Sequence, residues 1–194
     1  MTINDNKQSQ MIIIGITGTL GAGKGTIVEY LTSNKGFKHY SVRQFLIEEI
    51  EKLGLPVNRD TMTEVANELR AKHSPSYIIE QLYKKAFDNG GNAIIESIRT
   101  PGEVEFLKKQ GNFYLIAIDA NPRIRYDRIT LRASETDHIT FETFIANEKR
   151  EYITTDPNKQ NLSLCIQLAD IVIQNNGSLD ELQQQLEIKL VGIV

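Results

Sequence analysis

The feature that most constrains the fold is an apolar run followed by a glycine-rich turn and a helical pattern. Met11-Ile12-Ile13-Ile14-Gly15-Ile16 has the composition of a buried strand, and Gly18-Thr19-Leu20-Gly21-Ala22-Gly23-Lys24-Gly25-Thr26 follows one residue later. Glycine adopts positive φ at little cost and lets backbone N–H groups approach an anion. Lys24 and the N-terminus of the following helix add positive potential. This order predicts a phosphate-binding loop whose ligand is a nucleoside triphosphate.

The spacing within the loop supports this interpretation. Four residues separate Gly18 from Gly23-Lys24, as the phosphate-loop pattern requires. The residue after the lysine is Gly25, and the hydroxyl comes one place later at Thr26, which departs from the common form. The alternative is a glycine-rich turn that happens to carry a lysine, and the flanking strand and helix disfavour it. We predict that the nucleotide contacts Gly18, Gly21, Ala22, Gly23, Lys24, Gly25 and Thr26.

Composition restricts the protein class. The 194 residues are 40% hydrophobic, enough for one core, so we expect a disordered tail at 1–10 and a single domain at 11–194. A net charge of −3 disfavours binding to a nucleic acid polymer. No segment approaches 18 consecutive apolar residues and no signal peptide is evident, so we expect a cytoplasmic protein without a membrane partner. Nothing in the sequence predicts an oligomeric state.

Strand-like runs alternate with helical patterns along the chain. The runs are Ile12–Ile16, Lys38–Tyr40, Ala93–Glu96, Phe113–Ile118 and Ile171–Ile173. This alternation predicts an α/β fold of the three-layer P-loop NTPase type, with a parallel sheet of about five strands and helices on both faces.

Several helix starts have a chemical signature. Thr100-Pro101-Gly102-Glu103 combines an N-cap, a proline in the first turn and a capping-box glutamate. Thr61 and Glu64 suggest a second capping box, ahead of an apolar face. The polar segment near residues 132–140 lies between two helical patterns and suits a short lid, although an ordinary solvated loop is equally compatible.

The carboxyl ends of parallel strands mark the ligand side of such a sheet. The run that ends near Glu96 brings Glu96 and Arg99 to the same edge as the glycine loop. A carboxylate there can hold Mg²⁺ through water, and an arginine can hold a phosphate with two hydrogen bonds. The alternatives are a glutamate paired with Lys24 and a solvated arginine.

Further arginines are candidates for binding phosphate. Arg128 and Arg132 are four residues apart on one expected helix face, where like charges repel unless an anion lies between them. Arg125 belongs to the same cluster but can equally be solvated, and the alternative for the cluster is pairing with Asp119, Asp127 or Glu135. In the region after the first helix, Arg43, Arg59 and Arg70 are candidates to bind an acceptor, and each taken alone can equally be solvated.

Other catalytic chemistries lack support in the sequence. His39, His73 and His138 have no metal-like spacing, so a structural zinc site is not expected. The single cysteine, Cys165, lies on the apolar side of an expected helix and is interpreted as core. No nucleophile elbow occurs, and Asn34-Lys35-Gly36 does not form the guanine-binding signature of a GTP switch.

The loop ending Gly-Lys-Gly-Thr resembles that of the adenylate kinase family and other nucleoside monophosphate kinases. Ile94-Ile95-Glu96-Ser97-Ile98-Arg99 resembles their acidic segment, and Tyr126–Arg132 resembles their arginine pair at the lid. Ala169–Ser178 resembles the closing strand and loop of dephospho-coenzyme A kinases. The resemblance departs at Ile47, where an arginine for the acceptor phosphate is usual and for which Arg43 is a possible substitute, and at Glu96, where aspartate is more usual.

The resemblance implies an ATP- and Mg²⁺-dependent phosphotransferase acting on a small-molecule nucleotide, a nucleoside or deoxynucleoside monophosphate. Lys24, Arg99, Arg128 and Arg132 are then catalytic, and Arg43, Arg70 and Arg99 bind the acceptor. Thr26 reaches the α-phosphate, and Thr26 and Glu96 hold the metal through water. Two alternatives remain open: phosphorylation of a hydroxyl, as in dephospho-coenzyme A, and a nucleotide-binding regulatory protein without transfer activity.

Overall fold

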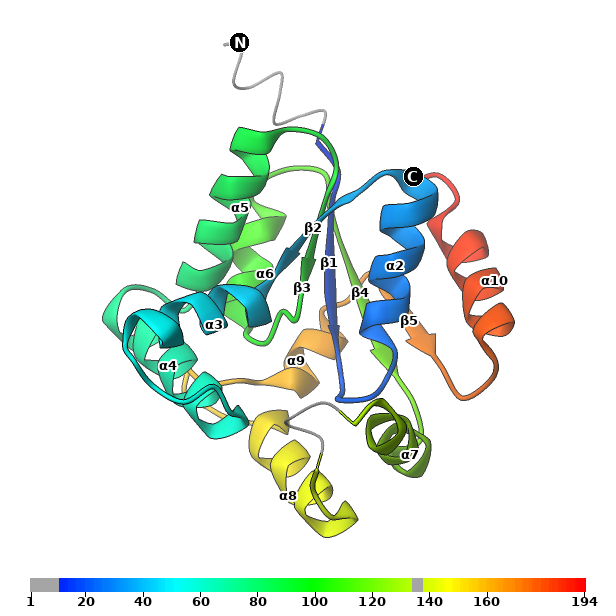
Figure 1. The fold of residues 1–194 in the computed structure, drawn as a ribbon. Helices are drawn as coiled ribbons and strands as arrows, with labels where there is room; N and C mark the ends of the chain where they lie inside the picture. Colours follow the sequence, from blue (N-terminus) through cyan, green and yellow to red (C-terminus); the bar gives the residue numbers. More distant parts are fainter. Residues whose placement is uncertain (1–10, 134–137) are drawn as a thin grey trace.

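The computed structural model describes residues 11–133 and 138–194. Its centre is a five-stranded parallel sheet with the strand order β2-β3-β1-β4-β5 (Figure 1). The strands are β1 (Ile13–Gly18), β2 (Lys38–Ser41), β3 (Ala93–Glu96), β4 (Phe113–Asp119) and β5 (Ile171–Gln174). The helices are α2 (Lys24–Lys35), α3 (Val42–Lys52), α4 (Arg59–Lys72), α5 (Tyr77–Asn89), α6 (Pro101–Lys108), α7 (Pro122–Arg132), α8 (Phe141–Tyr152), α9 (Leu162–Gln167) and α10 (Leu179–Leu190). The predicted α/β class and parallel sheet are confirmed, and each predicted strand is present.

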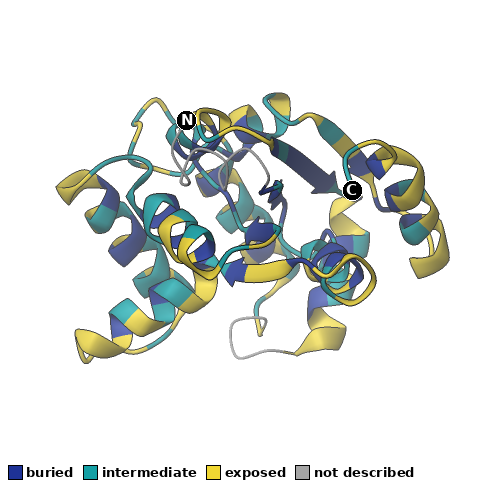
Figure 2. Ribbon diagram, turned by 90° about the horizontal axis from the view of Figure 1, so that it is seen from above, coloured by how far each residue is buried: buried dark blue, intermediate teal, exposed yellow. Residues whose placement is uncertain are grey.

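The sheet buries two apolar faces because side chains alternate along each strand. On β1, Ile13 packs into the cluster formed with α3, α4, α5, α6 and α9, while Ile14 and Ile16 pack into the cluster formed with α2 and α10. Figure 1 shows these two groups of helices on opposite sides of the sheet. The central strands β1 and β4 are mostly buried, which Figure 2 colours dark blue, and the outer faces of the helices are exposed. Central strands buried on both faces read as continuous apolar runs, which is why the sequence revealed them.

Helix starts follow the local chemistry with one correction. The Thr100–Glu103 capping box is confirmed, with the Thr100 hydroxyl accepting from Glu103 N and the Glu103 carboxylate accepting from Thr100 N. The capping box expected at Thr61 is wrong. Helix α4 begins at Arg59, because the Asn58 side chain accepts from Thr61 N and so caps the helix nearly one turn earlier.

The structure agrees with the interpretation of Cys165 as a core residue. Cys165 is fully buried in α9, and burial raises the pKa of its thiol to about 12, which suits a core residue. Across residues 11–133 and 138–194, no helix is long and apolar enough to cross a membrane. The expected tail at 1–10 and the centre of the expected lid, residues 134–137, lie outside the described residues.

The sheet determines where a ligand can bind. All five strands are parallel, so their carboxyl ends lie at one edge. Figure 1 shows α4, α7 and α8 gathered beyond that edge, together with the turn between β1 and α2. This arrangement leaves room for a cleft between the glycine loop and the helices opposite.

Candidate functional site

A cleft of about 690 Å³ lies at the carboxyl edge of the sheet. One side, which we call the loop side, is formed by the loop of residues 18–26, of which Leu20, Gly21 and 23–26 line the cleft. The other, which we call the arginine side, consists of Arg43, Arg59, Arg70, Arg99 and Glu151. Most of the residues predicted from sequence line the cleft: Gly21, Gly23, Lys24, Gly25, Thr26, Arg43, Arg70, Glu96, Arg99, Arg128 and Arg132.

The loop between β1 and α2 has the backbone of an anion nest. Gly21 has φ of 78° and Gly23, the N-cap of α2, has φ of 109°. A Cβ on Gly21 would clash with the carbonyl oxygen of Arg125, and a Cβ on Gly23 would lie 2.5 Å from Asn175 Nδ2. Both positions therefore favour glycine for conformation, and Gly21 also requires it for space, because its neighbour is backbone. The N-terminus of α2 then points its free N–H groups at the cleft.

Lys24 is the charged group of the loop. Its Nζ donates to the carbonyl oxygens of Gly18 at 2.9 Å and Thr19 at 2.8 Å. Burial and then the nearby Arg99 lower the pKa of Lys24, Glu96 partly opposes both, and the result is a pKa of about 7. An anion in the cleft would favour the protonated form of this amine.

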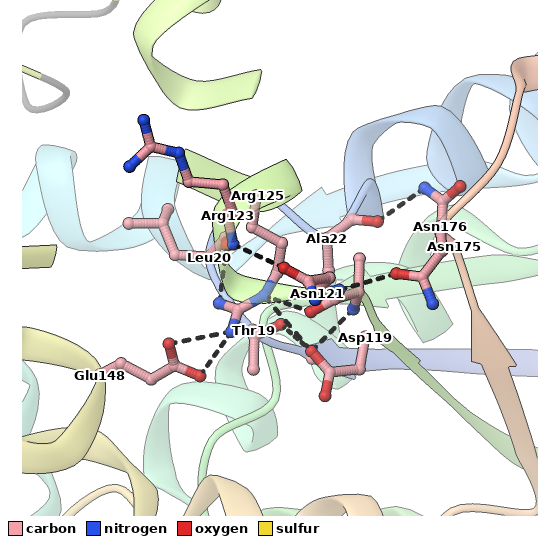
Figure 3. Close-up of polar contacts among 12 residues, drawn as sticks. Thr19, Leu20, Ala22, Asp119, Asn121, Arg123, Arg125, Glu148, Asn175 and Asn176 are labelled. Carbon is pink, nitrogen blue, oxygen red and sulfur yellow. Dashed lines mark hydrogen bonds and ion pairs between the residues drawn. The ribbon is translucent and has the colours of Figure 1, made fainter. Parts of the chain in front are cut away.

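A polar network connects the loop to neighbouring elements (Figure 3). Thr19 Oγ1 donates to Asp119 Oδ1 at 2.5 Å, and Asn175 Nδ2 donates to the Ala22 carbonyl at 2.8 Å. The buried Arg125 donates to the carbonyl oxygens of Ala120 and Leu20, and its guanidinium lies between Asp119 and Glu148 in Figure 3.

Arg125 therefore has a structural role. Its side chain is 2% exposed and bonds to both oxygens of Glu148, at 2.9 and 3.0 Å. Arg125 is therefore not solvated, contrary to one of the two sequence alternatives. Asp119 and Glu148 provide the compensating charge that permits its burial. Arg128, from the same helix, donates to the Asn175 carbonyl at 2.9 Å and lines the cleft.

The end of β3 places an acid beside the loop. Glu96 Oε2 lies 3.3 Å from His39 Nε2, so the carboxylate pairs with a histidine of β2. Burial works to raise the pKa of Glu96, but the hydrogen bond with His39 and the charge of Lys24 outweigh it and lower that pKa. Glu96 is therefore an anion at neutral pH.

The next residue carries backbone strain. Ser97 has φ of 72°, a left-handed conformation that costs a non-glycine residue about 1–3 kcal/mol. In this conformation the N–H groups of Ser97 and Ile98 both donate to the Ile16 carbonyl, at 2.9 and 3.1 Å. The turn carries the chain to Arg99, which lines the cleft.

Arg70 is fixed by the same capping box that starts α6. Glu103 Oε1 accepts from Arg70 Nε at 3.1 Å and Nη2 at 2.9 Å, while Oε2 accepts from the backbone N–H groups of Arg99 and Thr100. Both Arg70 and Glu103 side chains are at most 1% exposed. Within the described residues, Arg70 Nη1 has no hydrogen-bond partner, and Arg70 lines the cleft.

Sequence reasoning missed Glu151. Its carboxylate bonds to Arg59 Nη2 at 2.5 Å, lies 3.7 Å from Arg99 Nη1, and lines the cleft. It belongs to an alternating charge pattern that usually marks an exposed helix face. Its spacing from Phe144, which lies on the buried side of α8, was the only sequence signal that Glu151 faces the interior. Asp119, by contrast, lies at the end of a predicted strand, so the reasoning that identified Glu96 could also have identified it.

Some predicted residues lie elsewhere. Ala22 is fully buried, and Gly18 packs against β4, so neither lines the cleft. Ile47, where the resemblance expects an arginine, lines a separate hollow beside β2 and α5, while Arg43 borders both spaces. In residues 11–133 and 138–194, no cluster of three or more histidine, cysteine or acidic side chains is arranged to hold a metal.

A family model and a relative with a similar sequence both match most of this chain. Residues 14–154 match a family model described as an AAA domain. A UPF0200 protein of Methanococcus vannielii is 31% identical over 95% of this chain and 97% of its own length.

Two solved structures are similar in fold. A gluconokinase from Sinorhizobium meliloti superposes with a TM-score of 0.55 at 12% identity, covering 94% of this chain and 93% of its own. A shikimate kinase from Aquifex aeolicus does so with a TM-score of 0.53 at 15% identity, covering 93% and 97%. At these identities the likeness establishes a P-loop kinase-like fold.

Proposed function

Because this chain belongs to the AAA domain family and to the UPF0200 proteins, we propose that it is an ATP-dependent P-loop kinase. We propose that it transfers the γ-phosphoryl group of ATP to the phosphate of a nucleoside or deoxynucleoside monophosphate. One observation carries this proposal: a glycine-rich loop with Lys24 faces a cluster of arginines across a single cleft. The loop suits a triphosphate, and the arginines suit a second anionic ligand.

Charge neutralisation and positioning are what phosphoryl transfer requires of a protein. In this proposal the loop amides and Lys24 stabilise the β- and γ-phosphates, and Thr26 contacts the α-phosphate. Arg99, Arg128 and Arg132 stabilise the charge that develops during transfer. On the arginine side, Arg70 binds the acceptor.

The residues at the end of β3 suit a magnesium ion. Glu96 is ionised and lines the same cleft as Thr26, and carboxylate and hydroxyl oxygens are the ligands that Mg²⁺ prefers. We assign the ion to Thr26 and Glu96, in both cases through water. Mg²⁺ would neutralise charge on the phosphates and orient them.

The geometry of the arginine side favours an anionic acceptor over a neutral hydroxyl. Arg70 Nη1 and Arg99 Nη1 are buried atoms without a hydrogen-bond partner within residues 11–133 and 138–194. A buried unsatisfied donor costs about 1–3 kcal/mol, and a phosphate oxygen would remove that cost. A neutral hydroxyl would supply one weak acceptor. Arg43, exposed at the rim, adds a further positive charge.

The test is ADP release by purified protein with ATP and Mg²⁺, against ribo- and deoxynucleoside monophosphates and dephospho-coenzyme A. We expect one or more monophosphates to stimulate ADP release. Stimulation by dephospho-coenzyme A alone would transfer the assignment to hydroxyl phosphorylation. Tight ATP binding without any stimulation would favour a regulatory protein, and no ATP binding would end the proposal. The matched control is Lys24→Ala, which should not respond to any acceptor.

A further inference from the structure

We propose that Glu151 determines acceptor specificity by competing with the acceptor for Arg59 and Arg99. An acceptor must displace this built-in carboxylate, which selects a phosphate dianion over a carboxylate or a hydroxyl. The inference rests on the proposed function, because that function assigns the arginine side to the acceptor.

Glu151 lies where its carboxylate reaches both arginines. It lies near the end of α8, its side chain is 9% exposed, and it lines the same cleft as Arg59 and Arg99. Arg59 comes from the first turn of α4 and Arg99 from the segment after β3. The carboxylate therefore joins two arginines that come from different elements.

The contacts of Glu151 with Arg59 and with Arg99 are unequal. Glu151 Oε1 bonds to Arg59 Nη2 at 2.5 Å, whereas Oε2 lies 3.7 Å from Arg99 Nη1, beyond hydrogen-bond range. In the described chain, Arg59 Nε and Arg99 Nη1 are buried atoms without a hydrogen-bond partner. One carboxylate thus leaves part of the hydrogen-bonding capacity of both guanidinium groups unused.

Ligands differ in whether they can displace Glu151 from the two arginines. Glu151 is attached to the protein, so its effective concentration at the arginines is high. A ligand carboxylate brings the same charge and two oxygens, and therefore gains nothing over Glu151. A phosphate dianion brings about twice the charge and three strong acceptor oxygens. It can satisfy the unpartnered nitrogens of Arg59 and Arg99.

A second ion pair between the same two helices provides a control. Arg150 Nη2 lies 3.1 Å from Asp60 Oδ1, so the neighbours of Glu151 and Arg59 also form a pair. These side chains are 52% and 73% exposed and do not line the cleft. Exposed pairs contribute little, so removing Asp60 changes the net charge equally without touching the competition.

The experiment is a calorimetric titration of inorganic phosphate at pH 8 into protein saturated with a non-hydrolysable ATP analogue and Mg²⁺. The analogue occupies the loop, so phosphate reports on the arginine side. We expect Glu151→Gln to bind phosphate on the order of tenfold more tightly than wild type. Asp60→Asn should bind it as wild type does. In the ADP-release assay, Glu151→Gln should lower the KM for a monophosphate while kcat changes less.

The direction of the effect separates competition from simple support. If Glu151 only held the arginines in place, Glu151→Gln would weaken phosphate binding. The proposal would be overturned if Glu151→Gln left phosphate binding unchanged or weaker. It would also be overturned if Asp60→Asn tightened binding equally, or if no variant bound phosphate. Should Glu151→Gln fail to fold, Glu151→Asp keeps the charge on a shorter side chain and should tighten binding by a smaller factor. Phosphate binding needs no turnover, so this result is independent of whether the wild type shows acceptor-stimulated ADP release.

Discussion

The two sides of the cleft differ in how completely their polar groups are satisfied. On the loop side, Thr19 and Ala22 each bond to a neighbouring element, and Lys24 donates to two carbonyl oxygens. On the arginine side, three residues keep a buried nitrogen without a partner among the described residues: Arg59, Arg70 and Arg99. Both sides carry positively charged side chains, so they differ in how far their polar groups are already held by neighbouring residues.

This difference shows how the protein could treat the two proposed ligands differently. Under the proposed function, a loop already bonded to its neighbouring elements would bind a constant group, the triphosphate, with little reorganisation. Unsatisfied arginines would gain most from a ligand that provides the missing oxygens, and in the proposed function they would therefore discriminate between acceptors. We therefore expect substitutions on the loop side to affect stability and all nucleotide chemistry, and substitutions on the arginine side to affect the acceptor selectively.

The largest effect is expected for Lys24→Ala. It removes the charged group of the loop side, and loss of one preorganised donor costs on the order of 10²-fold or more in turnover. Initial rates of acceptor-dependent ADP release measure it. Near-normal turnover by a well-folded Lys24→Ala protein would contradict the proposed role.

The next effect is on stability, and two loop glycines provide a matched pair. Gly21→Ala forces a side chain into positive φ and against the Arg125 carbonyl, so we expect a loss of about 2 kcal/mol or more in the free energy of unfolding. Gly25 lies in the first turn of α2 with no atom within 4 Å of an added Cβ. Gly25→Ala should therefore stabilise the protein by up to about 1 kcal/mol. Urea unfolding measures both, and equal effects would show that the loop is not held as described.

On the arginine side, Arg99→Ala should act on the acceptor. Loss of a charge-assisted hydrogen bond costs about 1.5–3 kcal/mol, so kcat/KM for the acceptor should fall about 10- to 100-fold. The Kd for an ATP analogue should change much less. Arg150→Ala, which removes an exposed arginine outside the cleft, is the control. A loss of ATP affinity equal to the loss in kcat/KM would abolish the distinction between the two sides.

The pH dependence of nucleotide binding is a finer test of the loop side. The pKa of Lys24 is lowered to about 7, mainly by burial and then by Arg99, so Lys24 is largely neutral at pH 8.5. Bound phosphates favour the protonated amine, so binding takes up a proton above pH 7. The Kd should rise by up to about tenfold per pH unit above that value and level off below it. Calorimetry in buffers of different ionisation heat would detect the proton, and a constant Kd from pH 6 to 8.5 would contradict it.

The fold and the loop side were largely predictable from sequence because their signals are local. Buried parallel strands such as Phe113–Asp119 read as continuous apolar runs, and the glycine spacing of the loop is visible in nine residues. The capping box at Thr100 was equally local. The error at Thr61 arose because Asn58, three residues earlier, competes for the same helix end.

Most of the arginine side was less predictable. Arg70 and Glu103 are 33 residues apart, and Arg59 and Glu151 are 92 apart, so no periodicity or spacing connects them. A surface pattern of alternating charges looks the same whether or not a neighbouring helix covers it. Arg125 shows the same limit, since its burial depends on Glu148 in the next helix.

The sequence by itself determined the parallel α/β framework and the anion-binding turn, because chain neighbours make both. Tertiary structure alone decided which arginines are buried, which carboxylates neutralise them and which nitrogens remain unpaired. The physical reason is that the free energy of a charge depends on its solvation and on every charge packed around it. Those surroundings exist only after α4, α7 and α8 have assembled at the edge of the sheet.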